Sequence, residues 1–399
     1  MRALAVIDGE HYAPVVRDAL AELPYEFVAA LLVGGAEKLR GGEDYGVEVV
    51  ESLDHGLAAF DPEVIVDLSD EPVLGPRERL LLASRALAAG IPYVGADFRF
   101  DPPAFAPFPL PSLAVIGTGK RVGKTAVTGH LARLLARDRE VVVVSMGRGG
   151  PSEPEVVEVA PTLDDLLALS RAGRHAASDH LETAALAGVA TIGCRRCGGG
   201  LAGAPFSSNV LEGARLAAAL DPDMVVFDGS GAAIPPVAAG ARILVAHDLA
   251  AGLNPYRALV SDLVLTMSGE VAAQAAALGR PVIRFELRLQ PVEPLGGRRA
   301  AVFTTGPAAV GHLDGIVFRS ENLADRELLR RDLETVETAD VYVVELKAAA
   351  IDLVAETAAE RGVEVVLAGN AVVAPGLDEA LLELAEVAAG AKAGENPVR

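Results

Sequence analysis

The segment that most constrains this 399-residue chain joins an apolar stretch, a glycine-rich turn and a helix-forming stretch over residues 112–135. It reads SLAVIGTGKRVGKTAVTGHLARLL, and the turn ends in Gly123, Lys124 and Thr125. Glycines let backbone N–H groups approach a phosphate, and the N-terminus of the following helix adds partial positive charge. Lys124 can then reach the β and γ phosphates, and the Thr125 hydroxyl can meet Mg²⁺. The segment predicts a nucleotide phosphate-binding loop.

The first glycine of this turn departs from the strict phosphate-binding pattern. That pattern, G-x-x-x-x-G-K-[ST], requires glycine at position 118, where this chain has Thr118, and the glycine comes one residue earlier. A loop of the form G-T-x-x-x-V-G-K-T resembles that of dethiobiotin synthetase and related P-loop proteins. The alternative is a strand-to-helix turn that binds no nucleotide. We expect the nucleotide to be bound by Gly117, Thr118, Gly119, Gly123, Lys124 and Thr125.

Strand-like apolar runs alternate with alanine- and leucine-rich helical stretches along the whole chain. This alternation indicates an α/β protein whose central P-loop NTPase domain has a mostly parallel sheet and lies between two smaller α/β domains. The proline-rich stretch DPPAFAPFPLP suits neither a regular helix nor a central strand, so it marks a linker. The predicted segments are an N-terminal domain over 1–100, a linker over 101–111, the P-loop domain over 112–290, a linker over 291–297, a C-terminal domain over 298–390 and a frayed tail over 391–399.

The charge balance narrows the range of partners. The chain has 55 acidic and 35 basic residues, which gives a formal net charge of −20 at pH 7. Nucleic acids and anionic membrane surfaces are bound by clustered lysine and arginine, so we expect neither as a partner. The N-terminus does not read as a signal peptide, no apolar run reaches ~18 residues, and two cysteines make no disulfide framework. We therefore expect a cytoplasmic protein whose ligand is a small anion held by local positive groups.

Charged residues after two later strands add to the predicted nucleotide site. DMVVFDGSG supplies Asp228 at the end of an apolar run, where an acidic residue can hold Mg²⁺ directly or through water. Capping of the next loop is its alternative role. VVVVSMGRGG places Arg148 among glycines, where a guanidinium suits a γ-phosphate or a second phosphate. An ordinary surface turn is the alternative there. We expect Mg²⁺ to be held by Thr125 and Asp228.

The segment TIGCRRCGGG places two arginines between Cys194 and Cys197. A zinc site would need four ligands, and a redox pair would need a thioredoxin-like context. We therefore favour an anion-binding loop in which Arg195 and Arg196 contact the substrate and the cysteines mainly pack.

Two further groups keep open interpretations. His175 and Asp179 are four residues apart on a predicted helix, which suits either a metal site or a polar helix face near a ligand. Lys347 follows an apolar strand, so it either reaches a phosphate or pairs with a neighbouring carboxylate.

The N-terminal domain has polar residues directly after its first strand. Asp8, Glu10 and His11 lie where open α/β sheets bind ligands. We expect them to form a second site, or one wall of the same site. Helix capping is the alternative role for Asp8.

Ten segments spread over nearly the whole chain together resemble the cyclic 2,3-diphosphoglycerate synthetase family. They are IDGEHYAPV, LVGGAEKL, DLSDEPV, GIPYVGADFRFDPP, IGTGKRVGKTAV, MGRGGPSEPE, ASDHLE, RRCGGG, DGSGAAIPPV and VELKAAAID. The resemblance implies an ATP-dependent ligase that closes an intramolecular phosphoanhydride in 2,3-diphosphoglycerate and releases ADP and phosphate. It also implies a homodimer from a heat-adapted organism.

Such a reaction demands positioning and neutralisation of charge rather than a protein nucleophile. We expect ATP and Mg²⁺ as cofactors, and Lys120, Arg121, Lys124 and Arg148 as the catalytic residues around the transferring phosphoryl group. The expected substrate-binding residues are Arg148, Arg195, Arg196, Lys347, Asp8, Glu10 and His11.

Two other functions fit the phosphate-binding loop. A related ligase of the dethiobiotin or amide-forming kind would share the loop but act on a carboxylate. A nucleotide-hydrolysing switch or metallochaperone would use GTP, and it should carry the guanine motif [NT]-K-x-D. The nearest candidates, SDLVLTMSGE and AHDLAAGLN, lack the lysine of that motif, which favours ATP.

Overall fold

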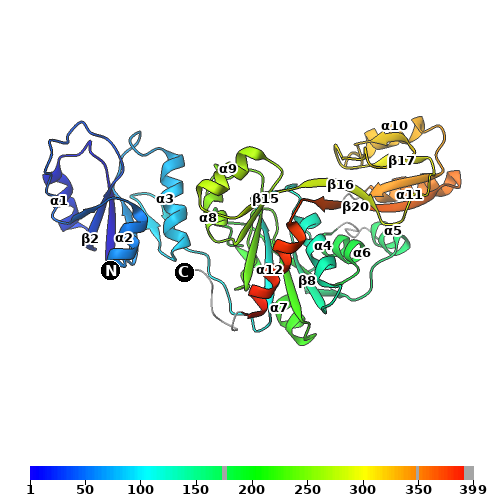
Figure 1. Ribbon diagram of the computed structural model, residues 1–399, viewed down its shortest axis with the longest axis horizontal. Coiled ribbons are helices and arrows are strands. Elements are labelled where there is room, and N and C mark those ends of the chain that lie inside the picture. The colour runs from blue at the N-terminus through cyan, green and yellow to red at the C-terminus, as the bar shows by residue number, and fades with distance from the viewer. Residues whose placement is uncertain (173–177, 347–349, 391–399) are drawn as a thin grey trace.

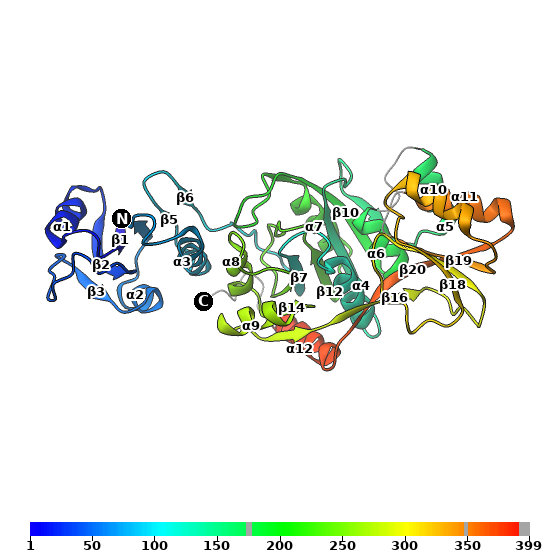
Figure 2. The ribbon, with the colours of Figure 1, turned by 90° about the horizontal axis from the view of Figure 1, so that it is seen from above.

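The computed structural model describes residues 1–172, 178–346 and 350–390. These residues form three α/β lobes in a row, with the N-terminal lobe at one end and the C-terminal lobe at the other (Figure 1). Figure 2, a quarter turn away, shows the same order. Each lobe has its own sheet, and the central sheet is the largest. The predicted α/β class, with a central domain of mostly parallel strands between two smaller α/β domains, is confirmed.

The N-terminal lobe is a doubly wound sheet with the strand order β3-β2-β1-β4-β5-β6. Its neighbouring strands are parallel except for β5 and β6. The strand order reverses between β1 and β4, so the loops after these two strands meet in one crevice. The elements are β1 (Arg2–Ile7), α1 (Ala13–Glu22), β2 (Glu26–Leu32), β3 (Glu48–Val50), α2 (Leu53–Phe60), β4 (Val64–Asp67), α3 (Pro76–Ala88), β5 (Tyr93–Val94) and β6 (Arg99–Phe100).

The central lobe is built around β7, which pairs in parallel with both β12 and β13. Alternate residues of β7 enter different cores, Leu113 and Val115 on one face and Ala114 and Ile116 on the other. Its sheet has the order β11-β10-β8-β12-β7-β13-β14-β15, with β9 paired to β10. The elements are β7 (Ser112–Gly117), α4 (Lys124–Leu135), β8 (Val141–Gly147), β9 (Glu155–Val157), α5 (Leu163–Arg171), α6 (Asp179–Ala187), β10 (Ala190–Cys197), β11 (Ser207–Ser208), α7 (Val210–Ala219), β12 (Met224–Asp228), β13 (Ala241–Ala246), α8 (Asn254–Leu259), β14 (Leu263–Thr266), α9 (Gly269–Ala277) and β15 (Val282–Arg284).

The C-terminal lobe has the strand order β16-β20-β19-β17-β18. β16 and β20 are antiparallel and form the ribbon that joins this lobe to the central one, while the other pairs are parallel. The elements are β16 (Glu286–Pro291), β17 (Ala300–Phe303), β18 (Ile316–Ser320), α10 (Arg326–Thr335), β19 (Val341–Glu345), α11 (Ile351–Arg361) and β20 (Glu364–Val373).

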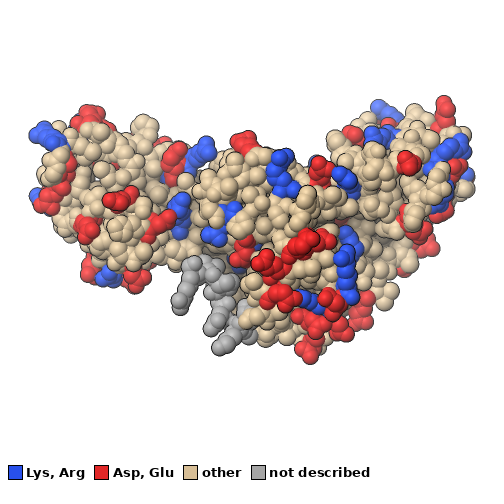
Figure 3. All heavy atoms as spheres, in the orientation of Figure 1, with Lys and Arg blue, Asp and Glu red and all other residues tan. Residues whose placement is uncertain are grey.

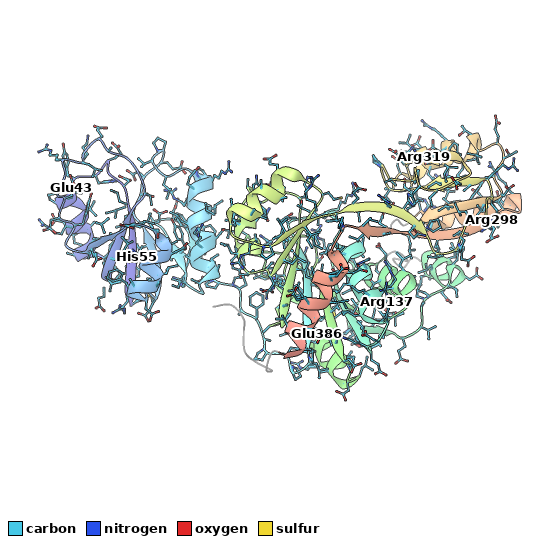
Figure 4. The ribbon with its side chains drawn as sticks, in the orientation of Figure 1. Glu43, His55, Arg137, Arg298, Arg319 and Glu386 are labelled. Carbon is cyan, nitrogen blue, oxygen red and sulfur yellow. The ribbon has the colours of Figure 1, made fainter. Side chains whose placement is uncertain are left out.

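The last helix, α12 (Leu377–Gly390), leaves the C-terminal lobe and packs on the central one. Its Leu381 is buried in the core that α4 and β7 share. Asp378 Oδ1 lies 2.7 Å from His130 Nε2 on α4, and Figure 4 places Glu386 on the same lobe. The predicted C-terminal domain therefore extends too far, because the periodicity of a helix shows that it has an apolar face but not which core that face enters.

Both predicted linkers are packed against the lobes. The first, over 101–111, forms neither helix nor strand, and its buried Phe108 makes an edge-to-face contact with Phe227 of β12. The second, over 291–297, starts inside the connecting ribbon, since Pro291 is the last residue of β16. The first linker thus belongs to the core of the central lobe, and the second begins within the sheet of the C-terminal lobe.

The chain carries a formal net charge of −20 at pH 7. Figure 3 shows acidic side chains gathered around α12 and over the lower part of the central lobe. Within the described ranges, no helix is both long and apolar enough to cross a bilayer. Because the net charge is negative, an anionic ligand has to be attracted by positive groups close to its own binding site.

The two cysteines of β10 lie in different environments. Cys194 is buried against α7, and its Sγ lies only 2.3 Å from where a Cβ on Gly213 would be. Cys197 is exposed, and both thiols are free. Residues three apart on a strand face opposite sides, which separates the thiols and argues against a shared zinc or redox site. Burial raises the pKa of Cys194 to about 12.

We expect Gly213→Ala to lower the free energy of unfolding by about 1–3 kcal/mol, because the added methyl group must displace the Cys194 thiol. The double variant with Cys194→Ala should recover most of this loss. Gly129→Ala on α4 is the matched control: its new Cβ would meet only the flexible end of Arg133, at 3.6 Å, and should be neutral or stabilising. Urea denaturation measures all three, and equal losses for both glycine variants would contradict this packing.

A thiol reagent should label the native protein once at pH 8. Burial keeps Cys194 in the unreactive thiol form at this pH and shields it from the reagent, whereas Cys197 is exposed. Cys197→Ser should therefore abolish rapid labelling, and denaturation of the wild type should release the second thiol. Equal labelling rates for the two native cysteines would contradict this assignment.

Candidate active site

The phosphate-binding loop runs from the end of β7 to Lys124, the first residue of α4. Arg121, with φ of 59°, and Gly123, with φ of 94°, adopt left-handed backbone conformations. A Cβ on Gly123 would lie 3.3 Å from both Phe285 and Leu287, in the segment that enters the connecting ribbon. Conformation and space therefore both favour glycine at this position.

Thr118, the residue that departs from the strict pattern, ties the loop to the end of β13. Its N–H donates to the carbonyl of Val245 at 3.2 Å, and its hydroxyl accepts from the N–H of His247 at 3.0 Å. A glycine at this position could not make the second bond. Threonine in place of glycine thus has a structural reason, because its hydroxyl ties the loop to the residues that follow β13.

Lys124 is held by the carboxylate that ends β12. Its Nζ donates to Asp228 Oδ1 at 2.7 Å, and Thr128 Oγ1 donates to the same oxygen at 3.0 Å. Lys124 is 7% exposed and Asp228 is fully buried. Burial disfavours the charged lysine, but the carboxylates of Asp228, Asp179 and Glu182 outweigh it and raise the pKa of Lys124. The lysine is therefore charged at neutral pH, before any phosphate arrives.

The loop borders a cavity of about 280 Å³. The side chains predicted as catalytic all line it. Gly117 and Thr118, which are also predicted to bind the nucleotide, are not among the lining residues. The sequence did not point to Ser145, Ser178 or Ser230, although Ser145 and Ser230 could have been found from their places at strand ends. The cavity is lined by Gly119–Thr125, Ser145, Gly147–Gly150, Ser178–His180, Ser230 and Gly231.

The residues predicted to hold Mg²⁺ fit that ion. Asp228 Oδ2 is buried and has no hydrogen-bond partner in the described part of the chain, which is costly for a carboxylate oxygen. Thr125 lines the P-loop cavity from the first turn of α4, whereas Asp228 is fully buried next to Lys124 and is not part of the lining. Hard oxygen ligands of this kind, completed by phosphate oxygens, suit Mg²⁺.

Arg148 and Arg196 approach the same glycine from neighbouring strands. A Cβ on Gly231 would lie 2.6 Å from Arg148 Nη2 and 3.5 Å from Arg196 Nη2. Arg195 precedes Arg196 on β10, so its side chain lies on the opposite face of the strand. Arg195 is exposed and does not line the P-loop cavity. The structure thus brings together two of the three predicted substrate arginines.

Asp8 and His11 line a separate crevice of about 1100 Å³ in the N-terminal lobe. Asp8 accepts from the N–H groups of Glu10 at 2.9 Å and Asp70 at 2.8 Å, and His11 Nδ1 lies 2.8 Å from it. Burial opposes ionisation of Asp8, but these bonds outweigh it and hold its pKa below the usual value. Glu10 accepts from the N–H of Ala36. None of the three predicted residues lines the P-loop cavity.

Two other predictions fall outside the described residues, those on Lys347 and His175. Asp179, the other half of the candidate metal pair, begins α6 and lines the P-loop cavity. In the part of the chain that the structure describes, no group of three or more His, Cys, Asp or Glu residues is arranged to hold a metal ion. Asp179 therefore lies beside the predicted nucleotide site, and both interpretations of the His175–Asp179 pair stay predictions.

Comparison with known proteins covers all three lobes. The profiles of the N-terminal, P-loop and C-terminal domains of cyclic 2,3-diphosphoglycerate synthetase match residues 2–101, 112–283 and 291–371. The protein of that name from Rubrobacter xylanophilus is 50% identical and is covered, like this chain, over 100% of its length. Its namesake from Thermococcus kodakarensis is 40% identical over 92% of this chain and 94% of its own. The chain therefore belongs to the cyclic 2,3-diphosphoglycerate synthetase family.

Proposed function

We propose that this protein uses ATP to close the intramolecular phosphoanhydride of 2,3-diphosphoglycerate, giving cyclic 2,3-diphosphoglycerate, ADP and phosphate. The observation that carries the proposal is a single cavity in which a phosphate-binding loop, with its charged Lys124, faces Arg148. Such a cavity can bring the end of a nucleotide and a second anion together. Membership of the family supplies the identity of that anion.

The chemistry proceeds in two balanced steps. In the first, an oxygen of one substrate phosphate attacks the γ-phosphorus of ATP, the bond to the ADP oxygen breaks, and a phosphoanhydride forms on the substrate. In the second, an oxygen of the other substrate phosphate attacks the inner phosphorus of that anhydride. The cyclic anhydride forms and inorganic phosphate leaves, so neither step needs a protein nucleophile.

The chain's own residues supply position and positive charge. Lys124 neutralises the β and γ phosphates, and Lys120, Arg121 and Arg148 surround the phosphoryl group in transfer. Thr125 and Asp228 would hold Mg²⁺, which offsets the negative charge that gathers when three phosphate groups meet. Because Asp228 already holds Lys124 in place, this lysine needs little reorganisation at the moment of transfer.

Four further expectations stay predictions: Mg²⁺ as the cation, a cytoplasmic location, a homodimer and a heat-adapted source. Sedimentation or light scattering of the purified protein tests the homodimer directly.

Phosphorus NMR of the purified protein with MgATP and 2,3-diphosphoglycerate should show ADP, inorganic phosphate and a cyclic pyrophosphate-type pair of signals in equal amounts. Chelation of divalent cations should stop all three. ADP and phosphate formed without a cyclic product would contradict the proposal and favour a nucleotide-hydrolysing switch. If a carboxylate substrate were consumed instead, the protein would be a ligase of the dethiobiotin kind.

Lys124→Ala should lower the turnover number by at least ~10²-fold, because the developing charge on the phosphates loses its fixed partner. The variant also leaves Asp228 buried without its cation, so Lys124→Ala with Asp228→Asn should be measured beside it. That double variant should melt closer to the wild type and stay inactive.

Lys38→Ala is the control for this pair of variants, because Lys38 lies on the N-terminal lobe over the ring of Tyr12. It should leave turnover unchanged. Turnover near that of the wild type in Lys124→Ala would remove this lysine from the mechanism.

A further inference from the structure

A second cavity opens on the far side of Gly231. It has a volume of about 440 Å³ and is lined by Arg148, Arg196–Gly200, Ala232 and Ala233. Arg148 also lines the P-loop cavity, so the two cavities share this arginine. Glycines 198, 199 and 200 line the second cavity without a side chain that would fill it, and the N–H of Gly200 donates to the carbonyl of Ala204 at 2.9 Å. Anion-binding concavities have the same composition, with backbone donors beside a guanidinium.

The two arginines of this cavity lack carboxylate partners within the described ranges. The guanidinium of Arg196 donates to the carbonyls of Gly198 at 2.7 Å and Ser230 at 2.9 Å, and its Nε is buried without an acceptor. Burial and the neighbouring charge of Arg148 lower the pKa of Arg196. Two guanidinium groups held together against their repulsion are an arrangement that an anion would stabilise.

A buried arginine fixes the turn that separates the two cavities. Ser230 and Ala233 form a tight turn through two backbone hydrogen bonds, with Gly231 and Ala232 at its tip. The carbonyl of Ala232 accepts from Arg257 twice, from Nε at 2.9 Å and from Nη2 at 2.7 Å.

Arg257 also fixes the loop on the other side of the second cavity. Its Nη1 donates to the carbonyl of Leu201 at 3.0 Å, one residue after the glycine run. The side chain is 2% exposed, and its acceptors are carbonyl oxygens and the side-chain oxygen of Asn254. A planar fork with five N–H donors can hold two loops at once, which a lysine could not do.

We propose that the Arg148–Arg196 cavity is a second phosphate subsite, and that Arg257 is the positioning residue that shapes it. This subsite takes the substrate phosphate that does not receive the γ-phosphoryl group, while the other phosphate lies beyond Gly231 in the P-loop cavity. The inference rests on the proposed function. It adds that one substrate molecule reaches across the Ser230–Ala233 turn, with one phosphate in each cavity. It makes the site selective for a vicinal bisphosphate over a monophosphate.

Equilibrium binding to the protein loaded with MgADP tests the subsite, with 2,3-diphosphoglycerate and 3-phosphoglycerate as probes. The wild type should bind the bisphosphate roughly 10- to 100-fold more tightly than the monophosphate, because the second phosphate gains charge-assisted hydrogen bonds from the arginines. Arg196→Ala should remove most of this preference. It should leave the affinity for ADP within about twofold, because Arg196 does not line the nucleotide cavity.

Arg257→Met tests the positioning role, and Arg242→Met is its matched control. Arg242 is also a buried arginine on the central lobe, and it donates to the carbonyl of Val260, away from both cavities. Arg257→Met should raise the KM for 2,3-diphosphoglycerate about tenfold or more with little change in the KM for ATP. Arg257→Lys should not restore it, and Arg242→Met should move neither KM.

The outcomes separate this inference from the function on which it rests. If the wild type forms the cyclic product but Arg196→Ala keeps the bisphosphate preference, the subsite lies elsewhere. If Arg257→Met and Arg242→Met raise the two KM values alike, Arg257 has only a structural role. If the wild type neither binds nor converts 2,3-diphosphoglycerate, the proposed function fails first and this inference fails with it.

Discussion

The buried ion pair between Lys124 and Asp228 is the interaction on which the site depends. It joins residues 104 positions apart in the sequence and links the phosphate-binding loop to the carboxyl end of β12. A lone charge at either position would be very unfavourable, so each residue stabilises the charge of the other and holds it in place. Lys124 opposes the rise that burial causes in the pKa of Asp228, although burial remains the larger effect. The ion pair forms when the protein folds, so the cost of removing the lysine from water is offset before any phosphate binds. A site arranged in this way is preorganised.

The parallel sheet explains why so much of this site is readable from sequence. Parallel strands end at one edge, so Lys124 after β7, Arg148 after β8 and Asp228 at the end of β12 must meet there once the strands are neighbours. The same rule left two places open for Asp8, a second site or one wall of the same site, and the crevice of the N-terminal lobe agrees with the first. Each sheet has its own carboxyl edge, and nothing in a strand-end pattern says that the edges of two sheets face each other. The N-terminal residues accordingly lie in the crevice between β1 and β4.

Other features depended on information that local patterns do not contain. Arg195 and Arg196 are chemically equivalent in the sequence, and only the pleat of β10 decides which one faces Arg148. α12 packs on the central lobe because the chain returns there after it has formed the whole C-terminal lobe. Arg257 could not be recognised at all, because its partners are backbone carbonyls, which every residue possesses.

The choice of arginine over lysine in this chain follows from the same geometry. A protein with a net charge of −20 can attract a multiply charged anion only through positive groups that are close to it and shielded from the outer carboxylates. An ammonium group is a point charge that flexes, whereas a guanidinium holds its plane when several acceptors surround it. Arg196 uses two carbonyls to stay beside Arg148, and Arg257 uses two loops to hold the turn between the cavities. Lysine occurs in the phosphate-binding loop itself, at Lys120 and at Lys124 at the start of α4, where a flexible single charge can follow a phosphate through its transfer.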